Sequence, residues 1–473
     1  MKTIIIEFLG LAVLMLACNK NPSTLKLEQV DLLVKNPTII DVRTGSMLKD
    51  HSIIIKNGNI EAILETSSIE TPPETKVVNA EDKYVIPGLW DVHTHIQNQN
   101  EIDLFFPLLI ANGVLGIRDM GGLLPSGFKE GSQRHEHVPK VIAAGPWVDG
   151  PTPEGVSPEA IVDTMVARGA DFLKIQSALP LDRLKAIAER ANELGIYLAG
   201  HTPYTVSVGE ASDIGLRSLE HYLEVYVSIS EKEEELRVQH IALVEQEFSV
   251  RTIAFPPLEQ RISTWSDEKA MKLIEKLVSN KTWMTPTHID WRAWAQSGTP
   301  TFWDDELLNL LPSEWLDSWK HDQHFGFKNI PNEELPDYYD HIKQWYEAYI
   351  QLTKLFHKHG VKFLAGTDVS SWNFQVPGAT LHDEIAIFVE AGLSPLEALQ
   401  TATSNVADYL QIDGYDGTVS VGQEADFVIL AADPIEDIHN LTKISAVVLD
   451  GNLIDKDEIN KLLESAPKVL MKE

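Results

Sequence analysis

The chain has 473 residues, more than one hydrophobic core usually supports, so we expect one large domain and at least one smaller unit. Lysine and arginine total 39 against 70 aspartates and glutamates, which gives a net charge of −31 at pH 7. This charge repels phosphate backbones and anionic lipid surfaces, so nucleic acid is excluded as an expected partner. The acidic residues are spread along the chain, as on a solvated surface.

The first residues form an apolar segment that ends at Cys18, the only cysteine of the chain. The segment from Ile4 to Ala17 is too short to span a bilayer. The pattern resembles a bacterial lipoprotein signal, which implies a signal peptide over residues 1–17 and a lipidated Cys18 with a polar tether over residues 18–24. The implied protein is exported and secreted to the periplasmic face or the cell surface, where only its N-terminal lipid contacts the membrane. A buried Cys18 is the plainer alternative.

Two stretches near the chain ends have the pattern of short β-strands. Residues 25–86 hold apolar alternations separated by turn signals such as Asn57-Gly58, and residues 411–460 hold a second set. The two pieces together predict one small β domain built from both ends of the chain. A C-terminal tail over residues 461–473 follows the second piece.

Residues 87–410 alternate apolar strands with amphipathic helices, the rhythm of a parallel sheet or barrel. Ser157 has the position of a helix cap, and the strand expected after that helix holds Lys174. The next predicted strand ends in His201. Both side chains are therefore expected near the C-terminal ends of strands.

A stretch at about residues 285–350 is crowded with tryptophans, tyrosines and acidic residues. It falls where the late loops of a barrel are expected, and we interpret it as an insertion. Helices packed on the outside of the barrel and a lid or pocket wall are both compatible with its composition.

An apolar run ends in two histidines, His93 and His95. Alternate residues of a strand share a face, so both imidazoles can bind one metal ion. Such a pair alone is a weak signal, since many pairs face solvent. Here His201, His221 and Asp368 also end predicted strands, and side chains at strand ends converge on the mouth of a barrel.

The run Pro-Gly-x-x-Asp-x-His-x-His that begins at Pro87, with the later markers in order, resembles the amidohydrolase superfamily. The resemblance implies an α/β fold, a distorted (β/α)8 TIM barrel with a small β-sandwich domain formed by both chain ends. It implies that the metal ligands are His93, His95, Lys174, His201, His221 and Asp368. In binuclear members the lysine is carbamylated and bridges two divalent ions. For Lys174 the alternative is a surface lysine at a strand end.

The chemistry implied by this ligand set is hydrolysis. Two divalent ions lower the pKa of a bridging water so that hydroxide forms near neutral pH, and one polarises the scissile carbonyl. Asp368 would act as general base and then as general acid toward the leaving amine. Zinc is the most plausible metal, and manganese, cobalt and iron are compatible with the same ligands.

Three further motifs, at residues 116–122, 381–384 and 402–407, resemble the branch that contains secreted Xaa-Pro and other dipeptidases, and imidazolonepropionase. Members of the imidazolonepropionase type typically lack the strand-four lysine, so Lys174 favours the dipeptidase side. The expected function is hydrolysis of non-cyclic amide bonds in a small-molecule substrate, a dipeptide or an N-acyl amino acid. The alternatives are a cyclic amide, lactone or phosphoester hydrolase on the same centre and a non-catalytic binding lipoprotein. The sequence does not indicate an oligomeric state.

Several side chains near the expected ligands are candidates for substrate contacts. Tyr204 and Tyr222 follow ligand histidines and could donate to a substrate carbonyl. His288 and His382 could line the pocket. Core packing is the alternative for all four. Arg118 with Asp119 fits a buried ion pair better than a substrate contact.

Overall fold

The computed structural model describes residues 25–26, 30–71, 73–150, 155–246, 261–412 and 414–466. Cys18, the predicted signal peptide and the tether lie outside the described residues, as do residues 467–473 of the predicted tail. Helix α18 (Lys456–Ser465) extends into that tail. Among the described helices, none is long and apolar enough to cross a membrane.

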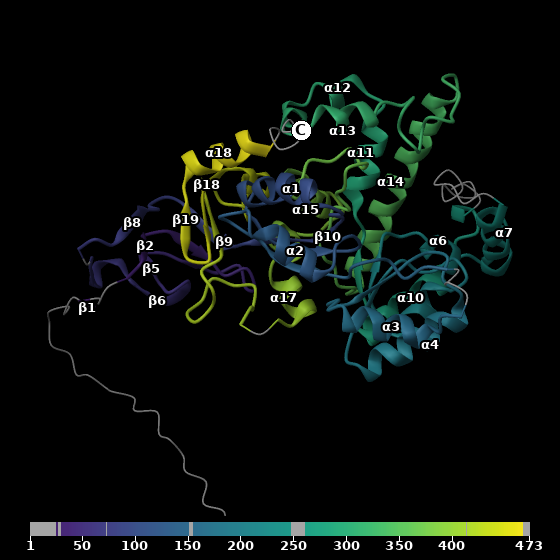
Figure 1. Ribbon diagram of the computed structural model, residues 1–473, viewed down its shortest axis with the longest axis horizontal. Coiled ribbons are helices and arrows are strands. Elements are labelled where there is room, and N and C mark those ends of the chain that lie inside the picture. The colour runs from purple at the N-terminus through teal and green to yellow at the C-terminus, as the bar shows by residue number, and fades with distance from the viewer. Residues whose placement is uncertain are drawn as a thin grey trace, which may run out of the picture.

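Strands from both chain ends meet in one six-stranded sheet (Figure 1). Its order is β19-β18-β17-β9-β3-β4, formed by Asn452–Ile454, Ile444–Leu449, Phe427–Leu430, Tyr84–Pro87, Thr38–Ile40 and Met47–Leu48. The junction is the antiparallel pairing of β17 with β9, in which Val428 faces Ile86. Residues that are far apart in the sequence therefore share one sheet.

A four-stranded sheet lies beside the six-stranded one. Its order is β6-β5-β2-β8, formed by Asn59–Glu65, His51–Lys56, Leu32–Lys35 and Lys76–Asn79. Asn57 and Gly58 join β5 to β6 with φ angles of 51° and 77°, as a tight hairpin turn requires. Val34 and Ile53 of this sheet pack in one apolar cluster with Phe427 and Ile429 of the other. A short parallel pair, β1 (Leu25–Lys26) with β7 (Ile69–Glu70), completes the β region.

The middle of the chain forms two parallel sheets. One has the order β10-β11-β12 and the other β13-β14-β15-β16. These strands are Leu89–Thr94, Val114–Asp119, Lys140–Ala143, Leu173–Ile175, Leu198–Gly200, Leu216–Glu220 and Trp283–Thr285. Single parallel bridges extend them: Val148 with Ile175, Met284 with Phe363, and Thr94 with Val369. The segment that holds Asp368 thus lies between β16 and β10.

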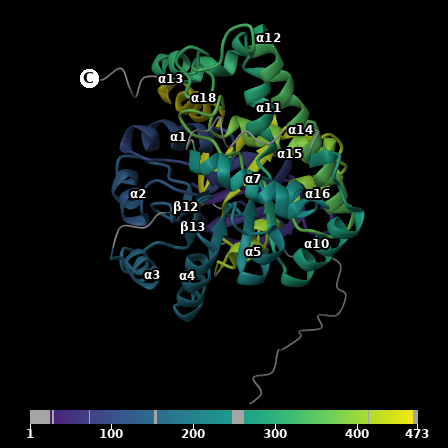
Figure 2. The same ribbon diagram turned by 90° about the vertical axis from the view of Figure 1, so that its right-hand side faces the viewer.

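Helices surround the parallel strands (Figure 2). They are α1 (Gln99–Ala111), α2 (Pro125–Ser132), α3 (Pro158–Ala167), α4 (Leu181–Glu193), α5 (Val208–Ile214), α6 (Val225–Ser228), α7 (Glu233–Gln246), α10 (Asp267–Asn280), α15 (Ala379–Glu390), α16 (Pro395–Gln400) and α17 (Ser404–Leu410). Ser157 caps α3 as predicted, because its hydroxyl accepts from the Ala160 amide. The α/β fold is confirmed, while the predicted domain boundaries stay predictions.

The aromatic-rich stretch after β16 is helical. It contains α11 (His288–Gln296), α12 (Pro300–Trp303), the 3-10 helix η2 (Glu306–Leu310), α13 (Ser313–Ser318) and α14 (Leu335–Lys358). Trp319 and His324, between α13 and α14, pack on Phe374 in the loop after Asp368, with ring centroids 5.5 and 4.6 Å apart. The stretch therefore contacts the loop that follows Asp368.

Candidate metal centre

Five of the predicted ligands converge where the parallel strands end. His93 lies on β10, and His95, His201 and His221 directly follow β10, β14 and β15. The nearest Asp368 carboxylate oxygen is 3.2, 3.0 and 4.0 Å from Nε2 of His93, His95 and His221. The ring centroid of His221 is 4.9 Å from those of His93 and of His201. The ligand atoms of His93, His221 and Asp368 all lie within 4.8 Å of one another, so these three side chains could hold a metal ion even without the other predicted ligands.

Lys174, the sixth predicted ligand, lies on β13 and is fully buried. Its Nζ has no hydrogen-bond partner among the described residues. Burial lowers its pKa to about 8, although the nearby carboxylates of Glu220 and Asp368 favour the charged form. Burying an amine without a hydrogen-bond partner costs free energy. A carboxyl group added to Nζ, bound in turn to metal ions, would remove this cost. The surroundings of Lys174 therefore fit a carbamylated, metal-bridging lysine better than a surface lysine.

The ring orientation of the four histidines is set by partners of their Nδ1 atoms. The partners are Glu220 for His93 (2.9 Å), the Gly121 carbonyl for His95 (2.9 Å), Ser177 for His201 (2.6 Å) and Thr287 for His221 (2.6 Å). A carbonyl can only accept, so His95 donates from Nδ1 and its Nε2 faces the centre. The histidines thus offer Nε2 toward the centre, as metal binding requires.

A buried ion pair contacts His93 through the Glu220 carboxylate. Arg118 Nη2 donates to Glu220 Oε1 at 2.8 Å, and Arg118 Nε donates to the Val92 carbonyl at 2.7 Å. Both charged side chains are inaccessible to solvent. Burial raises the pKa of Glu220, but the attraction of Arg118 and the contact with His93 outweigh it and hold this pKa well below its usual range. The predicted pair of Arg118 with Asp119 is therefore wrong: Arg118 does form a buried ion pair, but its partner is Glu220.

Asp91 and Asp119 hold the backbone around the ligands. Asp91 accepts from the Thr367 hydroxyl at 2.6 Å and the Thr367 amide at 3.0 Å, which ties β10 to the residue before Asp368. Asp119 accepts from the Ile96 amide at 2.7 Å. Burial raises the pKa of each carboxyl to about 7.

Three residues at the centre have a left-handed backbone conformation, which residues other than glycine rarely adopt. The φ angles are 61° at His221, 51° at Thr287 and 64° at Asp368. Each such residue costs about 1–3 kcal/mol, a cost often found at functional sites. Neighbours on a regular strand point to opposite faces, so the turn at His221 explains how both Glu220 and His221 reach the centre.

Three of the four predicted substrate contacts form hydrogen bonds within the protein, which favours the packing alternative, and their substrate role stays a prediction. Tyr222 and His288 are fully buried, and each binds the Thr353 hydroxyl of α14 at 2.7 Å. His382 donates from Nε2 to the Asn112 carbonyl at 2.8 Å and joins α15 to the end of α1. Their polar atoms hold helices together. Tyr204 is partly exposed, with its ring 5.9 Å from that of His240, and stays a prediction.

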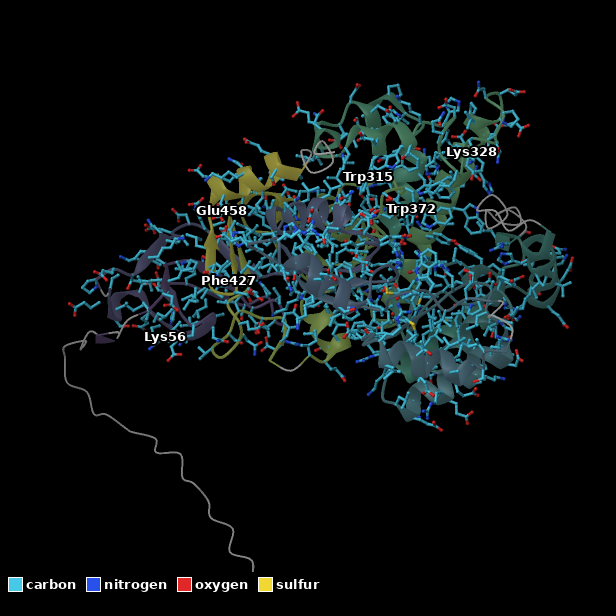
Figure 3. All side chains as sticks on the ribbon, in the orientation of Figure 1. Lys56, Trp315, Lys328, Trp372, Phe427 and Glu458 are labelled. Atoms are coloured by element: carbon cyan, nitrogen blue, oxygen red, sulfur yellow. The ribbon has the colours of Figure 1, made fainter. Side chains whose placement is uncertain are left out.

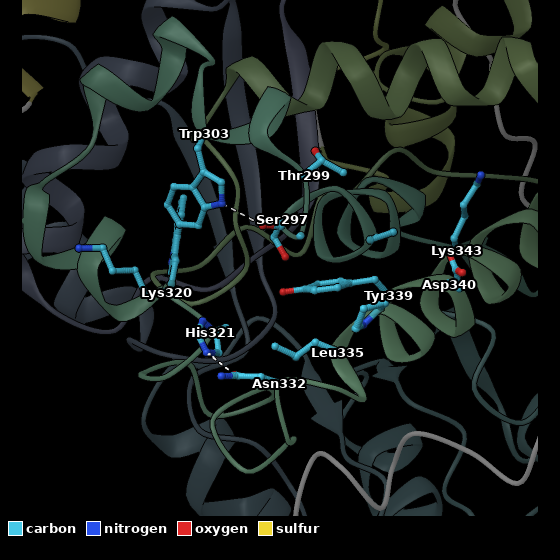
Figure 4. Close-up of a pocket in the computed structure, with 14 residues that line it drawn as sticks. Ser297, Thr299, Trp303, Lys320, His321, Asn332, Leu335, Tyr339, Asp340 and Lys343 are labelled. Atoms are coloured by element: carbon cyan, nitrogen blue, oxygen red, sulfur yellow. Dashed lines mark hydrogen bonds between the residues drawn. The ribbon is translucent and has the colours of Figure 1, made fainter.

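A separate hollow of about 720 Å³ lies inside the aromatic insertion (Figure 4). Trp303, Trp319 and Tyr339 form its aromatic walls, and the Trp303 indole donates to the Ser297 carbonyl at 2.9 Å. No predicted metal ligand lies among the residues that line it. This hollow is therefore distinct from the candidate centre.

Comparison with known proteins supports the predicted family resemblance. Residues 346–454 match the model of the amidohydrolase family. The adenine deaminase of Ruegeria sp. (strain TM1040) is 40% identical over 68 residues, which are 14% of this chain and 11% of the deaminase. The adenine deaminase of Ruegeria pomeroyi (strain ATCC 700808 / DSM 15171 / DSS-3) is 38% identical over 71 residues, 15% of this chain and 12% of the deaminase. The chain thus matches little more than a tenth of the length of these curated relatives.

Solved structures resemble the chain over nearly its whole length. A putative prolidase from Bifidobacterium longum has a TM-score of 0.62 and 20% identity, covering 92% of this chain and 99% of its own. Bottromycin amidohydrolase has a TM-score of 0.67 and 21% identity, and the match covers 92% of this chain and 90% of the amidohydrolase. A Xaa-Pro dipeptidase with bound methionine in the active site has a TM-score of 0.61 and 19% identity, covering 90% and 99%. These likenesses show a shared fold. The predicted resemblance to the amidohydrolase superfamily is confirmed by the family match over residues 346–454.

Proposed function

We propose that the protein is a metal-dependent hydrolase of amide C–N bonds whose substrate is a dipeptide or an N-acyl amino acid. The observation that carries the proposal is the meeting of four histidines, an aspartate and a buried, unpartnered lysine at the ends of parallel strands. The prolidase-type and dipeptidase-type structures among the neighbours support the substrate class. In this proposal the two parallel sheets form a (β/α)8 barrel, and the two terminal sheets form the β-sandwich.

The ligand set fits two divalent ions, with zinc the most plausible choice for imidazole and carboxylate donors. His93, His95, His201, His221 and Asp368 would hold them, with carbamylated Lys174 as the bridge. When bound, the ions would supply Lewis acidity toward water and toward the scissile carbonyl.

Asp368 has the position of the proton carrier. Burial raises its pKa, but His93 and His95 outweigh this effect and hold the pKa well below its usual range, so the carboxylate is ionised at neutral pH. Its side chain keeps 16% exposure, which leaves it open to substrate. Water adds to the carbonyl carbon while Asp368 takes one of its protons. The C–N bond of the tetrahedral adduct then breaks as Asp368 gives that proton to the leaving amine, and the carbonyl forms again in the acid product.

A second candidate is hydrolytic removal of an amino group from a heterocyclic ring, with release of ammonia. The local matches to adenine deaminases favour it, and the same ligands could serve it. Ammonia release from aminopurines, without hydrolysis of any dipeptide, would decide for this candidate.

We also propose that the protein is exported and lipid-anchored through Cys18. The support is the apolar segment that ends at the single cysteine. Radiolabelled palmitate should enter the full-length chain expressed in bacteria and should not enter a Cys18→Ser variant.

The proposed function is tested with purified, metal-loaded protein and a panel of dipeptides, N-acetyl amino acids, aminopurines, lactones and phosphoesters. We expect hydrolysis of dipeptides or acyl amino acids, detected as free amine. A chelator should abolish this activity and added zinc, manganese or cobalt should restore it, because the Lewis acid is then removed and returned. Turnover of none of the amides by metal-loaded protein would contradict the proposal.

A further inference from the structure

We infer that Trp147 and Trp372 are the walls of a subsite that selects substrates with a bulky apolar group next to the scissile bond. The inference rests on the proposed function and adds the side-chain class of the substrate. Two tryptophans flank one predicted ligand, His95: the ring centroids of Trp147 and Trp372 lie 5.7 and 6.3 Å from that of the imidazole. An apolar group that lies over His95 would contact indole carbon atoms.

Trp147 is anchored and yet exposed. Its indole Nε1 donates to the Met120 carbonyl at 3.0 Å, and its ring stands at 88° to that of His95. The residue nevertheless keeps 43% of its surface exposed. When a ligand covers a large apolar surface that is both fixed and exposed, the burial of that surface favours binding.

Gly121 leaves the room that the Trp147 indole occupies. A Cβ atom at Gly121 would lie 1.6 Å from the indole Nε1, and the φ angle of 149° is one that other residues rarely adopt. The carbonyl of the same glycine accepts from Nδ1 of His95. Gly121 therefore makes room for Trp147 and also orients the adjacent ligand His95. This shared contact places Trp147 beside the proposed reaction centre.

Trp372, labelled in Figure 3, lies in the loop that begins at Asp368. It is partly exposed. The aromatic insertion holds this loop: His324 Nε2 donates to the Trp372 carbonyl at 2.9 Å, and Trp319 Nε1 donates to the Ser371 carbonyl at 2.8 Å. Asn373 Nδ2 also donates to the Asp368 carbonyl at 2.6 Å. The insertion thus supports the second wall and the proton carrier together, which gives its aromatic composition a role.

The chemistry of the two walls favours apolar groups. Indole faces gain little from small side chains and most from large aliphatic or aromatic ones. An indole face also attracts cations, so a basic side chain is the competing occupant. We commit to the apolar occupant, because Trp147 already uses its only polar side-chain atom within the protein, so that the rest of its exposed ring is carbon.

The test compares kcat/KM for two series of dipeptides, one varied before and one after the scissile bond, with alanine, leucine, phenylalanine and lysine. We expect the wild type to favour leucine or phenylalanine over alanine by about tenfold or more in one series. Trp147→Ala and Trp372→Ala should each lose most of that preference and keep their metal content, while Trp372→Phe should retain it. Trp303→Ala is the matched control, because this exposed tryptophan lines the separate hollow.

The outcomes separate the inference from the proposed function. If metal-loaded wild type hydrolyses no amide, the proposed function fails. If amides are hydrolysed without a preference for bulky apolar groups, with a preference for lysine, or with a preference that both alanine variants keep, the inference alone is overturned. A variant that loses its circular dichroism spectrum is replaced by the Trp→Leu change at the same position, for which the same loss of preference for phenylalanine is expected.

Discussion

Asp368→Asn is expected to lower kcat for amide hydrolysis by about 10²–10⁴-fold, the usual contribution of a positioned general base. Asparagine has nearly the same shape as aspartate, but it cannot accept the proton of the attacking water. It also offers a weaker ligand to the metal than the carboxylate that now faces His93 and His95 at 3.2 and 3.0 Å. Steady-state rates and elemental analysis on the same preparations measure the two effects.

Asp163→Asn is the control for this variant, because Asp163 lies on α3 with 49% of its side chain exposed. Its rate should match that of the wild type. A rate for Asp368→Asn within a few-fold of the wild-type rate, in protein with full metal content, would rule out Asp368 as the proton carrier.

Arg118→Met is expected to destabilise the protein by about 3–5 kcal/mol, since it leaves the Glu220 carboxylate buried without its counter-charge. Arg118 also loses hydrogen bonds to the Val92 carbonyl and to the hydroxyls of Ser218 and Tyr409. The free energy of unfolding is measured by urea denaturation of the metal-free protein, so that metal affinity does not enter.

Arg190→Met is the matched control, because Arg190 pairs with Asp163 on the surface and such pairs contribute little. The double variant Arg118→Met/Glu220→Leu should regain much of the lost stability, since no buried charge is left alone. It should still bind metal about 10–100-fold more weakly, because His93 has lost its Nδ1 partner. Equal urea midpoints for Arg118→Met and wild type would show that the buried pair does not support the fold.

The sequence predicted the parts of the molecule that depend on local pattern. His93 and His95 were expected on one strand face, and their rings lie 5.2 Å apart. Ser157 caps α3 as predicted, with its hydroxyl accepting from the Ala160 amide. Alternation and capping are short-range effects, so the order of nearby residues is enough to reveal them.

The remaining features depend on contacts between distant segments. The pairing of Arg118 with Glu220 joins neighbours in space that are far apart in the chain, and no pattern around Arg118 indicates this partner. Tyr222 follows a ligand and was expected to contact substrate, but it points to Thr353 of α14, and sequence adjacency to a ligand does not reveal this direction. The signal that could have identified Glu220 was its position just before His221 at the end of a strand.

The most direct test of the proposed centre is elemental analysis of wild type and Lys174→Ala, both purified without chelator. We predict about two divalent ions per wild-type chain and a sharp fall in the variant, because the bridging ligand is removed. Mass spectrometry under native conditions with added bicarbonate should also show one carbamyl group on wild type only. One ion or fewer in both proteins would contradict a bridged binuclear centre and would leave Lys174 without the role assigned to it.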